Sequence, residues 1–170
     1  MADLLVKLYE LPDLHPYLQA LKQKKIVIRK PIGPENYAVI AWIRQYFEAG
    51  WASEAENAFF RSPKGIYIAV QETDGAPGSV LGFACWDATA RGLFGPTGVM
   101  EKARGQGIGA ALLLACLYAM KEEGYAYGII GGAGPVAFYE KICNAVVIPD
   151  SVPGIYGGML DCNVERKNEG

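Results

Sequence analysis

Residues 104–110, with the sequence RGQGIGA, have the residue types and spacing best suited to chemistry. Three glycines, Gly105, Gly107 and Gly109, stand where a polar loop changes into an apolar stretch that continues to Met120. Glycine at the start of a helix costs backbone entropy and weakens the first turn, so its use there needs a reason. Successive bare amides at a helix N-terminus form an anion-binding nest, and the helix dipole adds partial positive charge. The segment is therefore expected to bind phosphate groups.

Two familiar phosphate-binding motifs fit this loop poorly. A P-loop needs Gly-Lys followed by Ser or Thr, and the chain contains no such triplet. A dinucleotide fingerprint, GxGxxA, is matched by Gly105, Gly107 and Ala110. However, the residues EKAR separate these glycines from the preceding strand pattern, and the next strand pattern ends in Gly131-Gly132 instead of an acidic residue that would hold a ribose. A glycine-rich turn that merely begins a helix is the structural alternative.

The same loop fills the pattern [Arg/Gln]-x-x-Gly-x-[Gly/Ala], the pyrophosphate cradle of acyl-coenzyme A proteins, from Arg104 to Gly109. A second segment, GPVAFYEKICNAVVI at 134–148, follows it at a suitable distance. Together these segments resemble the signature regions of the GNAT N-acetyltransferase superfamily. The resemblance covers 26–160 by element order and is specific at 97–113 and 134–148. It implies an α/β fold in which a central mixed sheet has splayed parallel strands and helices on both faces.

The resemblance also implies roles for individual residues. The backbone of the strand before the loop would hold the pantetheine arm, and the amide of Val99 or Met100 would polarise the thioester carbonyl. Tyr139 would act as the general acid that protonates the leaving thiolate, because its phenol has a suitable ordinary pKa. The structural alternative for Tyr139 is a packed tyrosine on an amphipathic helix. The implied cofactor-binding residues are Val99, Met100, Arg104, Gly105, Gln106, Gly107, Ile108, Gly109 and Ala110.

Several positions depart from the family pattern. Glu101 replaces a common proline, Cys143 and Asn144 replace a glycine and an aromatic residue, and Gly132 stands where many members have asparagine. Thr97 occupies the position of a glutamate that serves some members as the general base, and a threonine cannot replace it.

The general base is therefore left open. Asp87, Glu101, Glu72 or a chain of water molecules are the candidates, and each carboxylate has the ordinary surface role as its alternative. The acceptor amine would lie between residues 46–51 and 149–158, where Trp51 and Tyr156 are candidate wall residues or core residues.

The elements that must position these residues follow from hydrophobic periodicity and from turn residues. Strands are predicted at 4–11, 26–30, 65–72, 79–88, 92–100, 125–132 and 145–149, with a further short strand after the loop that begins at 151. Helices are predicted at 13–25, 34–50, 51–62, 108–123 and 134–143. Pro96 removes a ladder donor from what should be a central strand, so we expect a bulge there and a splay towards strand 125–132.

Composition limits the classes of function. The chain has 170 residues and a formal net charge of −2, without a run of Lys or Arg, so nucleic acid is not an expected partner. Four cysteines without CxxC spacing and a single histidine predict no metal site, and the cysteines are expected to be reduced, mostly core residues. The longest apolar run is too short for a membrane span, and residues 1–13 do not resemble a signal peptide. We therefore expect a cytoplasmic protein.

These inferences combine into one functional hypothesis. Residues 1–25 form an N-terminal extension of one strand and one helix, residues 26–162 a single domain, and residues 163–170 a polar tail. The resemblance implies an N-acetyltransferase that moves an acetyl group from acetyl-CoA to a primary amine of a small molecule or peptide, by direct attack in a ternary complex. A non-catalytic acyl-CoA-binding regulatory domain is the alternative. A third possibility is a partner domain that dimerises through its apolar helix and extension, and a homodimer is also compatible with catalysis.

Overall fold

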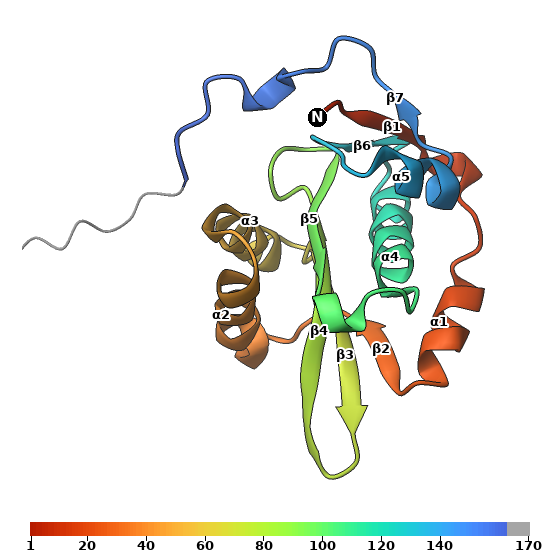
Figure 1. Cartoon of the computed structure of the whole chain (residues 1–170), viewed down its shortest axis with the longest axis vertical. Coiled ribbons are helices and arrows are strands. Elements are labelled where there is room, and N and C mark those ends of the chain that lie inside the picture. Colours follow the sequence, from red (N-terminus) through yellow and green to blue (C-terminus); the bar gives the residue numbers. More distant parts are fainter. Residues whose placement is uncertain (163–170) are drawn as a thin grey trace, which may run out of the picture.

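The computed structural model describes residues 1–162, and the predicted polar tail at 163–170 lies outside them. A seven-stranded mixed sheet with the order β2-β3-β4-β5-β6-β1-β7 forms the centre, with helices on both faces (Figure 1). All pairings are antiparallel except that of β5 with β6. This confirms the predicted α/β fold class.

The strands are β1 (Leu4–Lys7), β2 (Ile26–Arg29), β3 (Ile66–Thr73), β4 (Ala76–Trp86), β5 (Leu93–Val99), β6 (Tyr127–Ile130) and β7 (Val146–Val147). The helices are α1 (His15–Lys22), α2 (Asn36–Tyr46), α3 (Ala49–Phe60), α4 (Ile108–Glu122) and α5 (Val136–Cys143). Short 3-10 turns cover Leu8–Glu10, Gly33–Glu35, Glu101–Ala103 and Gly154–Tyr156.

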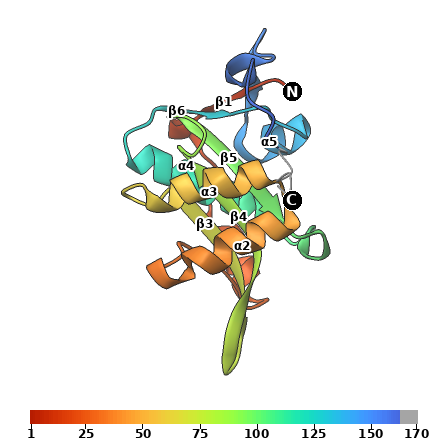
Figure 2. The same cartoon turned by 90° about the vertical axis from the view of Figure 1, so that its left-hand side faces the viewer.

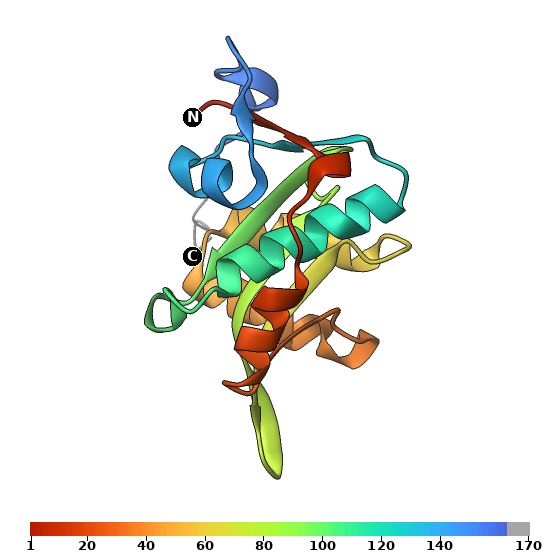
Figure 3. The same cartoon turned by 90° about the vertical axis from the view of Figure 1, so that its right-hand side faces the viewer.

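The two faces of the sheet carry separate apolar clusters. Helices α2 and α3 cross one face (Figure 2), where Ile43, Phe59 and Phe83 are buried. Helix α4 runs along the other face, with α1 beside it (Figure 3), and is buried along nearly its whole length. Burial of most of its apolar surface explains why α4 is apolar on nearly every side. A rigid α4 in turn fixes the loop that precedes it.

The central strands β5 and β6 pair only where Leu93 lies opposite Ile129 and Phe94 opposite Ile130. On its other side β5 pairs with β4, with a register shift between the Trp86–Phe94 and Ala84–Thr97 pairs. Two steps along β4 match three steps along β5, so β5 carries an extra residue beside Pro96. The predicted bulge is present. The predicted splay is present too: it is the gap between β5 and β6 beyond Phe94 and Ile130, along which one edge of β5 has no neighbouring strand.

Strand β1 lies inside the sheet, between β6 and β7. Leu4 is opposite Ile130 on one side and Val147 on the other. The predicted strand at 4–11 is too long, because Leu8–Glu10 is a 3-10 turn that buries Leu8 under α4. The N-terminal segment therefore supports β6, the strand that borders the splay.

Two other expectations are wrong in detail. The helix predicted at 34–50 ends at Tyr46, and Gly50 lies in the first turn of α3 instead of terminating α2. Phe47 makes the break, because its extended backbone lets the ring pack directly on Gly98, where a Cβ would lie 2.5 Å from the ring. The short strand predicted after 151 is replaced by the 3-10 turn Gly154–Tyr156.

Candidate functional site

The N-terminus of α4 presents unpaired amides to one side of the splay. The amide of Ala111 donates to the Gly107 carbonyl at 3.0 Å, so the preceding amides of Ile108, Gly109 and Ala110 have no acceptor within the helix. Ile108 and Ala110 bury their side chains in the core. These two residues can therefore contact a ligand only through their backbones, which is the contribution an anion nest requires.

The loop glycines have two different explanations. Gly105 and Gly107 have φ values of +76° and +87°, which residues with a side chain rarely adopt, and a Cβ at either would meet nothing within 4 Å. Gly109 has ordinary helical backbone, and a Cβ there would lie 3.7 Å from Phe138 and 3.8 Å from Val99. The first two glycines shape the nest, while Gly109 lies where α4, α5 and the end of β5 meet.

The edge of β5 ends at Val99, whose backbone faces the splay. The amide of Met100 donates to the Leu81 carbonyl of β4 at 2.9 Å. Because peptide groups alternate along a strand, the amide and carbonyl of Val99 point to the opposite side. The Val99 carbonyl accepts a hydrogen bond from Arg104 Nε at 3.2 Å, which ties the loop to the strand. The amide of Met100 is already hydrogen-bonded to β4, so the expectation that it could polarise a thioester carbonyl is corrected. Of the two amides considered for this role, only that of Val99 is left.

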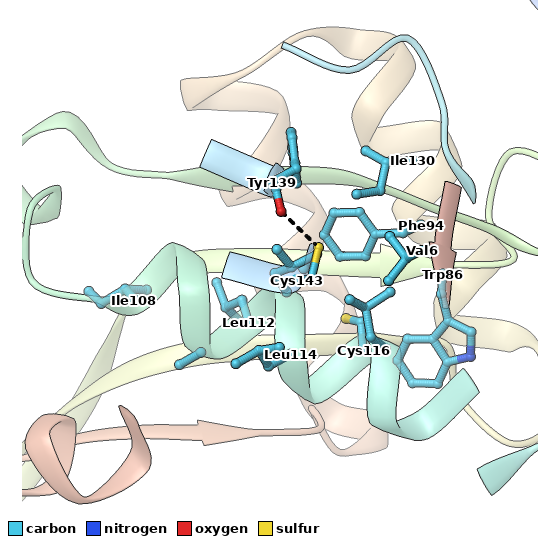
Figure 4. Packing of buried hydrophobic residues seen from close by; sticks show 14 of the residues in the cluster. Val6, Trp86, Phe94, Ile108, Leu112, Leu114, Cys116, Ile130, Tyr139 and Cys143 are labelled. Carbon is cyan, nitrogen blue, oxygen red and sulfur yellow. Dashed lines mark hydrogen bonds between the residues drawn. The ribbon is translucent and has the colours of Figure 1, made fainter. Parts of the chain in front are cut away.

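Tyr139 lies on α5, against the α4 face of the same splay (Figure 4). Its ring packs edge-to-face on Phe138 and Phe94, with centroids 5.1 Å and 6.4 Å away. Burial raises the pKa of Tyr139, and the nearby Cys143 adds to this rise, so the phenol stays protonated at neutral pH. Within residues 1–162, the Tyr139 hydroxyl is not a fully buried polar atom that lacks a hydrogen-bond partner. Tyr139 combines a packed ring with a protonated hydroxyl.

The three carboxylates considered as the general base either lie away from the splay or are held by hydrogen bonds and an ion pair. Asp87 accepts hydrogen bonds from the Tyr125 hydroxyl at 2.7 Å and from the Gly92 amide at 2.7 Å, and it pairs with Arg61 at 3.2 Å. These contacts hold the turn between β4 and β5. Glu101 and Glu72 are exposed, at the start of the loop and near the end of β3. The structure therefore does not bring any of the three into the splay.

The opposite face of β5 carries an aromatic group that includes the predicted wall residue Trp51. Trp51 stacks on Phe47 with centroids 5.7 Å apart, and both rings contact Phe83. Trp51 is only partly buried, so one side of this group is open. Tyr156, the other predicted wall residue, lies over the two glycines that follow β6.

Two residues near Tyr156 were not predicted from the sequence. Glu54 of α3 accepts a short hydrogen bond of 2.5 Å from the hydroxyl of Thr89, which lies in the turn between β4 and β5. The two residues are 35 positions apart, and neither belongs to a recognisable motif. Only the packing of α3 on the sheet brings them together, so no sequence signal was available.

Within residues 1–162, no group of three or more His, Cys, Asp or Glu side chains is placed to hold a metal ion. Across the same residues, no helix has both the length and the apolar character needed to cross a membrane. Three cysteines, Cys85, Cys116 and Cys143, are buried as predicted, and Cys162 is exposed.

Comparison with solved structures gives two informative similarities. The glucosamine N-acetyltransferase region of a fungal multi-domain GH3 beta-N-acetylglucosaminidase superposes with a TM-score of 0.69 at 15% identity, covering 86% of this chain and 19% of that one. A GCN5-related N-acetyltransferase from Sphaerobacter thermophilus gives a TM-score of 0.62 at 21% identity, covering 86% of this chain and 48% of that one. This chain thus spans about a fifth and about half of these two proteins. Comparison with curated proteins gave no match.

The mixed sheet with helices on both faces is a fold that both solved structures share. The sequence of residues 36–144 matches the acetyltransferase (GNAT) family, and this segment is more than half of the chain. The chain therefore belongs to the acetyltransferase (GNAT) family.

Proposed function

We propose that the protein is an N-acetyltransferase that moves an acetyl group from acetyl-CoA to a primary amine of a small molecule or peptide. One observation carries the proposal. The unpaired edge of β5 leads directly into an amide nest at the start of α4, so a thioester site and a phosphate site adjoin. Family membership supports acetyl transfer, and the geometry supports acetyl-CoA as the donor.

Cofactor binding uses the backbone in two ways. The amides from Gly105 to Ala110 face the pyrophosphate, with the positive end of the α4 dipole behind them. The side chain of Arg104 adds a positive charge beside this nest. The amide of Val99 donates to the thioester carbonyl, because it faces the splay while its neighbour Met100 is bonded to β4.

Tyr139 serves as the general acid. When the amine attacks the carbonyl carbon, the C–N bond forms, the C–S bond breaks, and the thiolate takes the phenolic proton. A phenol of raised pKa keeps this proton until the thiolate appears. Tyr139 packs on the α4 face of the sheet, whereas the aromatic group around Trp51 lies on the other face. The donor and the acceptor can therefore approach from opposite sides.

Direct attack in a ternary complex is favoured over an acetyl-cysteine intermediate. Cys143 is the cysteine beside Tyr139, and burial raises its pKa to about 11. Its thiol donates to the Tyr139 carbonyl at 3.2 Å, so it is also held within α5 (Figure 4). Such a thiol has little thiolate at neutral pH and is a poor nucleophile.

Two measurements test the proposal. Saturating acetyl-CoA should raise the melting temperature, because a ligand that binds only the native state stabilises it. Thiol release from acetyl-CoA should then depend on an added primary amine, measured across a panel of amino acids, amino sugars, polyamines and peptides. An absence of any thermal shift would remove the proposal. A shift without amine-dependent thiol release would identify a non-catalytic acyl-CoA-binding domain instead.

A further inference from the structure

The ring of Phe47 lies beside the amide that is proposed to bind the thioester carbonyl. A Cβ at Gly98 would lie 2.5 Å from Cε1 of Phe47, so the ring rests directly on the backbone of β5. The peptide group that joins Gly98 to Val99 carries the Val99 amide. The Phe47 ring is therefore next to the proposed point of acetyl transfer.

The same contacts fix the face of the sheet on which this ring lies. The side chain of Val99 is on the α4 face, because its Cγ2 would lie 3.8 Å from a Cβ at Gly109. Side chains alternate along a strand, so the missing side chain of Gly98 and the Phe47 ring belong to the opposite face. A molecule held against Phe47 therefore reaches the thioester from the side opposite Tyr139, which packs on the α4 face.

Trp51 extends the surface that Phe47 begins. Its ring stacks on that of Phe47, with centroids 5.7 Å apart and an angle of 21° between the rings. Both side chains are only half-buried, so each keeps part of its surface free of protein contacts. Two nearly parallel rings present a flat apolar surface, which suits an aromatic group of a ligand. We call Phe47 and Trp51 the stacked pair.

The two segments that border the stacked pair carry negative charge only. Residues 45–60 contain three glutamates and no Lys or Arg, and residues 142–162 contain two aspartates and no Lys or Arg. The second segment passes from β7 to the side of the sheet that carries α3 (Figure 1). There a Cβ at Gly50, the neighbour of Trp51, would lie 3.6 Å from Cys162 Cβ. Acidic residues therefore approach the stacked pair from both segments.

This charge distribution favours one kind of acceptor. A protonated amine is attracted to a negative surface before it loses its proton, whereas a carboxylate is repelled. Arg104 is a cation close to Val99, but its Nε donates to the Val99 carbonyl at 3.2 Å. Its charge belongs to the phosphate nest proposed above. A carboxylate on the acceptor would thus find no basic partner within either segment that borders the stacked pair.

We propose that the acceptor is an arylalkylamine, a primary amine joined to an aromatic ring by a short alkyl chain, without a carboxylate. The inference rests on the proposed acetyl transfer and names the substrate class of that site. The aromatic ring packs on the stacked pair, and the nitrogen reaches the thioester at Val99. The nitrogen loses one proton to solvent, Tyr139 protonates the thiolate, and solvent reprotonates Tyr139. The products are an N-acetyl arylalkylamine and free CoA.

A matched set of amines gives the first test. The compounds 2-phenylethylamine, phenylalanine and phenylalaninamide share one ring and differ at the carboxyl group, while ethylamine lacks the ring. Compared per free amine, kcat/KM for 2-phenylethylamine should exceed that for phenylalanine and for ethylamine by about tenfold each. Phenylalaninamide should recover most of the loss, and 1 M salt should narrow the gap for phenylalanine. Equal use of phenylalanine or of ethylamine would overturn the inference.

Substitution of Trp51 tests the stacked pair. Trp51→Leu keeps an apolar side chain but removes the ring, so KM for 2-phenylethylamine should rise about tenfold. KM for ethylamine and the affinity for acetyl-CoA should change less than twofold. Trp51→Phe restores a ring and should recover most of the affinity. Phe60→Leu, at a site on the same helix that is 71% exposed, is the control. Equal losses for both amines in Trp51→Leu would show a packing role instead.

A charge reversal tests the exclusion of carboxylates. Glu48 lies between the two members of the stacked pair in the sequence and is exposed. Glu48→Lys should raise the rate with phenylalanine relative to 2-phenylethylamine by about threefold at low salt. Glu122→Lys makes the same change at an exposed site at the far end of α4 and should leave this ratio unaltered. Equal ratios in the two variants would contradict the electrostatic part of the inference.

A binding measurement gives a readout that needs no turnover. Calorimetric titration of 2-phenylethylamine into the protein saturated with CoA should show binding in the wild type and about tenfold weaker binding in Trp51→Leu. If the wild type acetylates primary amines without preference for aromatic ones, this inference alone is overturned. A wild type that binds acetyl-CoA and acetylates no amine would remove the proposed function, and the substrate class with it.

Discussion

At the scale of single residues, the site depends on side chains and backbone groups that serve packing and chemistry together. Tyr139 buries its ring in the core that fixes α5 and carries a hydroxyl that the ring packing does not use. Gly105 and Gly107 have no side chain to contribute and act by allowing a left-handed backbone. The two functions of such a residue can be separated by substitutions that change only one of them.

Tyr139→Phe makes this separation for the phenol. The ring contacts with Phe94 and Phe138 remain, so the melting temperature and the acetyl-CoA affinity should change little. Loss of the proton donor should lower kcat by about 10²-fold or more. Steady-state kinetics and calorimetric titration check both parts. Tyr37→Phe, at an exposed site on α2, is the control, and unchanged turnover in Tyr139→Phe would refute the general-acid role.

Gly107→Ala separates backbone shape from stability in the nest. A Cβ at φ +87° should cost about 1–2 kcal/mol of unfolding free energy and move the amides away from the anion. Gly75→Ala is a matched control, because Gly75 has φ +71° and equally open surroundings in the distant β3–β4 hairpin. Denaturant unfolding should show similar losses for both variants. Only Gly107→Ala should weaken acetyl-CoA binding, and equal affinities would argue against the nest.

At the scale of elements, the splay depends on what holds β6 in place. Strand β1 pairs with β6 along its whole length, and the side chains of Leu4 and Val6 are fully buried. The far wall of the splay is thus supported by the N-terminal segment. The contribution of this segment should be measurable as a change in the unfolding free energy when its packing is disturbed.

Leu4→Ala should lower the unfolding free energy by about 2–5 kcal/mol, because it leaves a cavity between buried side chains. Leu160→Ala removes the same atoms from a side chain that is 84% exposed and should have almost no effect. Chemical denaturation followed by tryptophan fluorescence compares the two variants. Equal stabilities would mean that β1 is only loosely attached.

The sequence predicted most elements but not every contact between them. Turn residues and periodicity correctly indicated the β3–β4 hairpin, the apolar α4 and the bulge at Pro96, since each of these is a local property. The place of β1 inside the sheet depends on pairing with residues far along the chain, which no local pattern contains. The break at Phe47 arises from its packing on Gly98, and the meeting of Glu54 with Thr89 arises from the docking of α3.

At the scale of the whole molecule, the free energy of unfolding should depend on pH in the acid range, because one well-formed ion pair contributes to it. Arg29 at the end of β2 donates to both oxygens of Glu35 at 2.8 Å and 2.6 Å, which secures the chain just before α2. The Arg29 guanidinium, helped by the Ile32 amide and opposed by burial, lowers the pKa of Glu35 to about 2. A lowered pKa means that the unfolded chain binds this proton more readily than the folded one.

The stability from this pair should be present above the ordinary glutamate pKa and should disappear as the pH falls from about 4.5 to about 2. Glu35→Gln should therefore flatten the fall in unfolding free energy across this range, with urea unfolding at several pH values as the measurement. Glu56→Gln changes an exposed carboxylate and should keep the wild-type slope. A parallel slope in Glu35→Gln would show that other carboxylates control acid unfolding.

The position of β1 also has a consequence for how the chain is made. Leu4 leaves the ribosome more than 120 residues before its partners Ile130 and Val147. At ordinary rates of synthesis this delay is on the order of ten seconds. During that time Leu4 and Val6 have no sheet to enter and stay available to chaperones. The wall that borders the splay is therefore completed only after β6 and β7 have been translated.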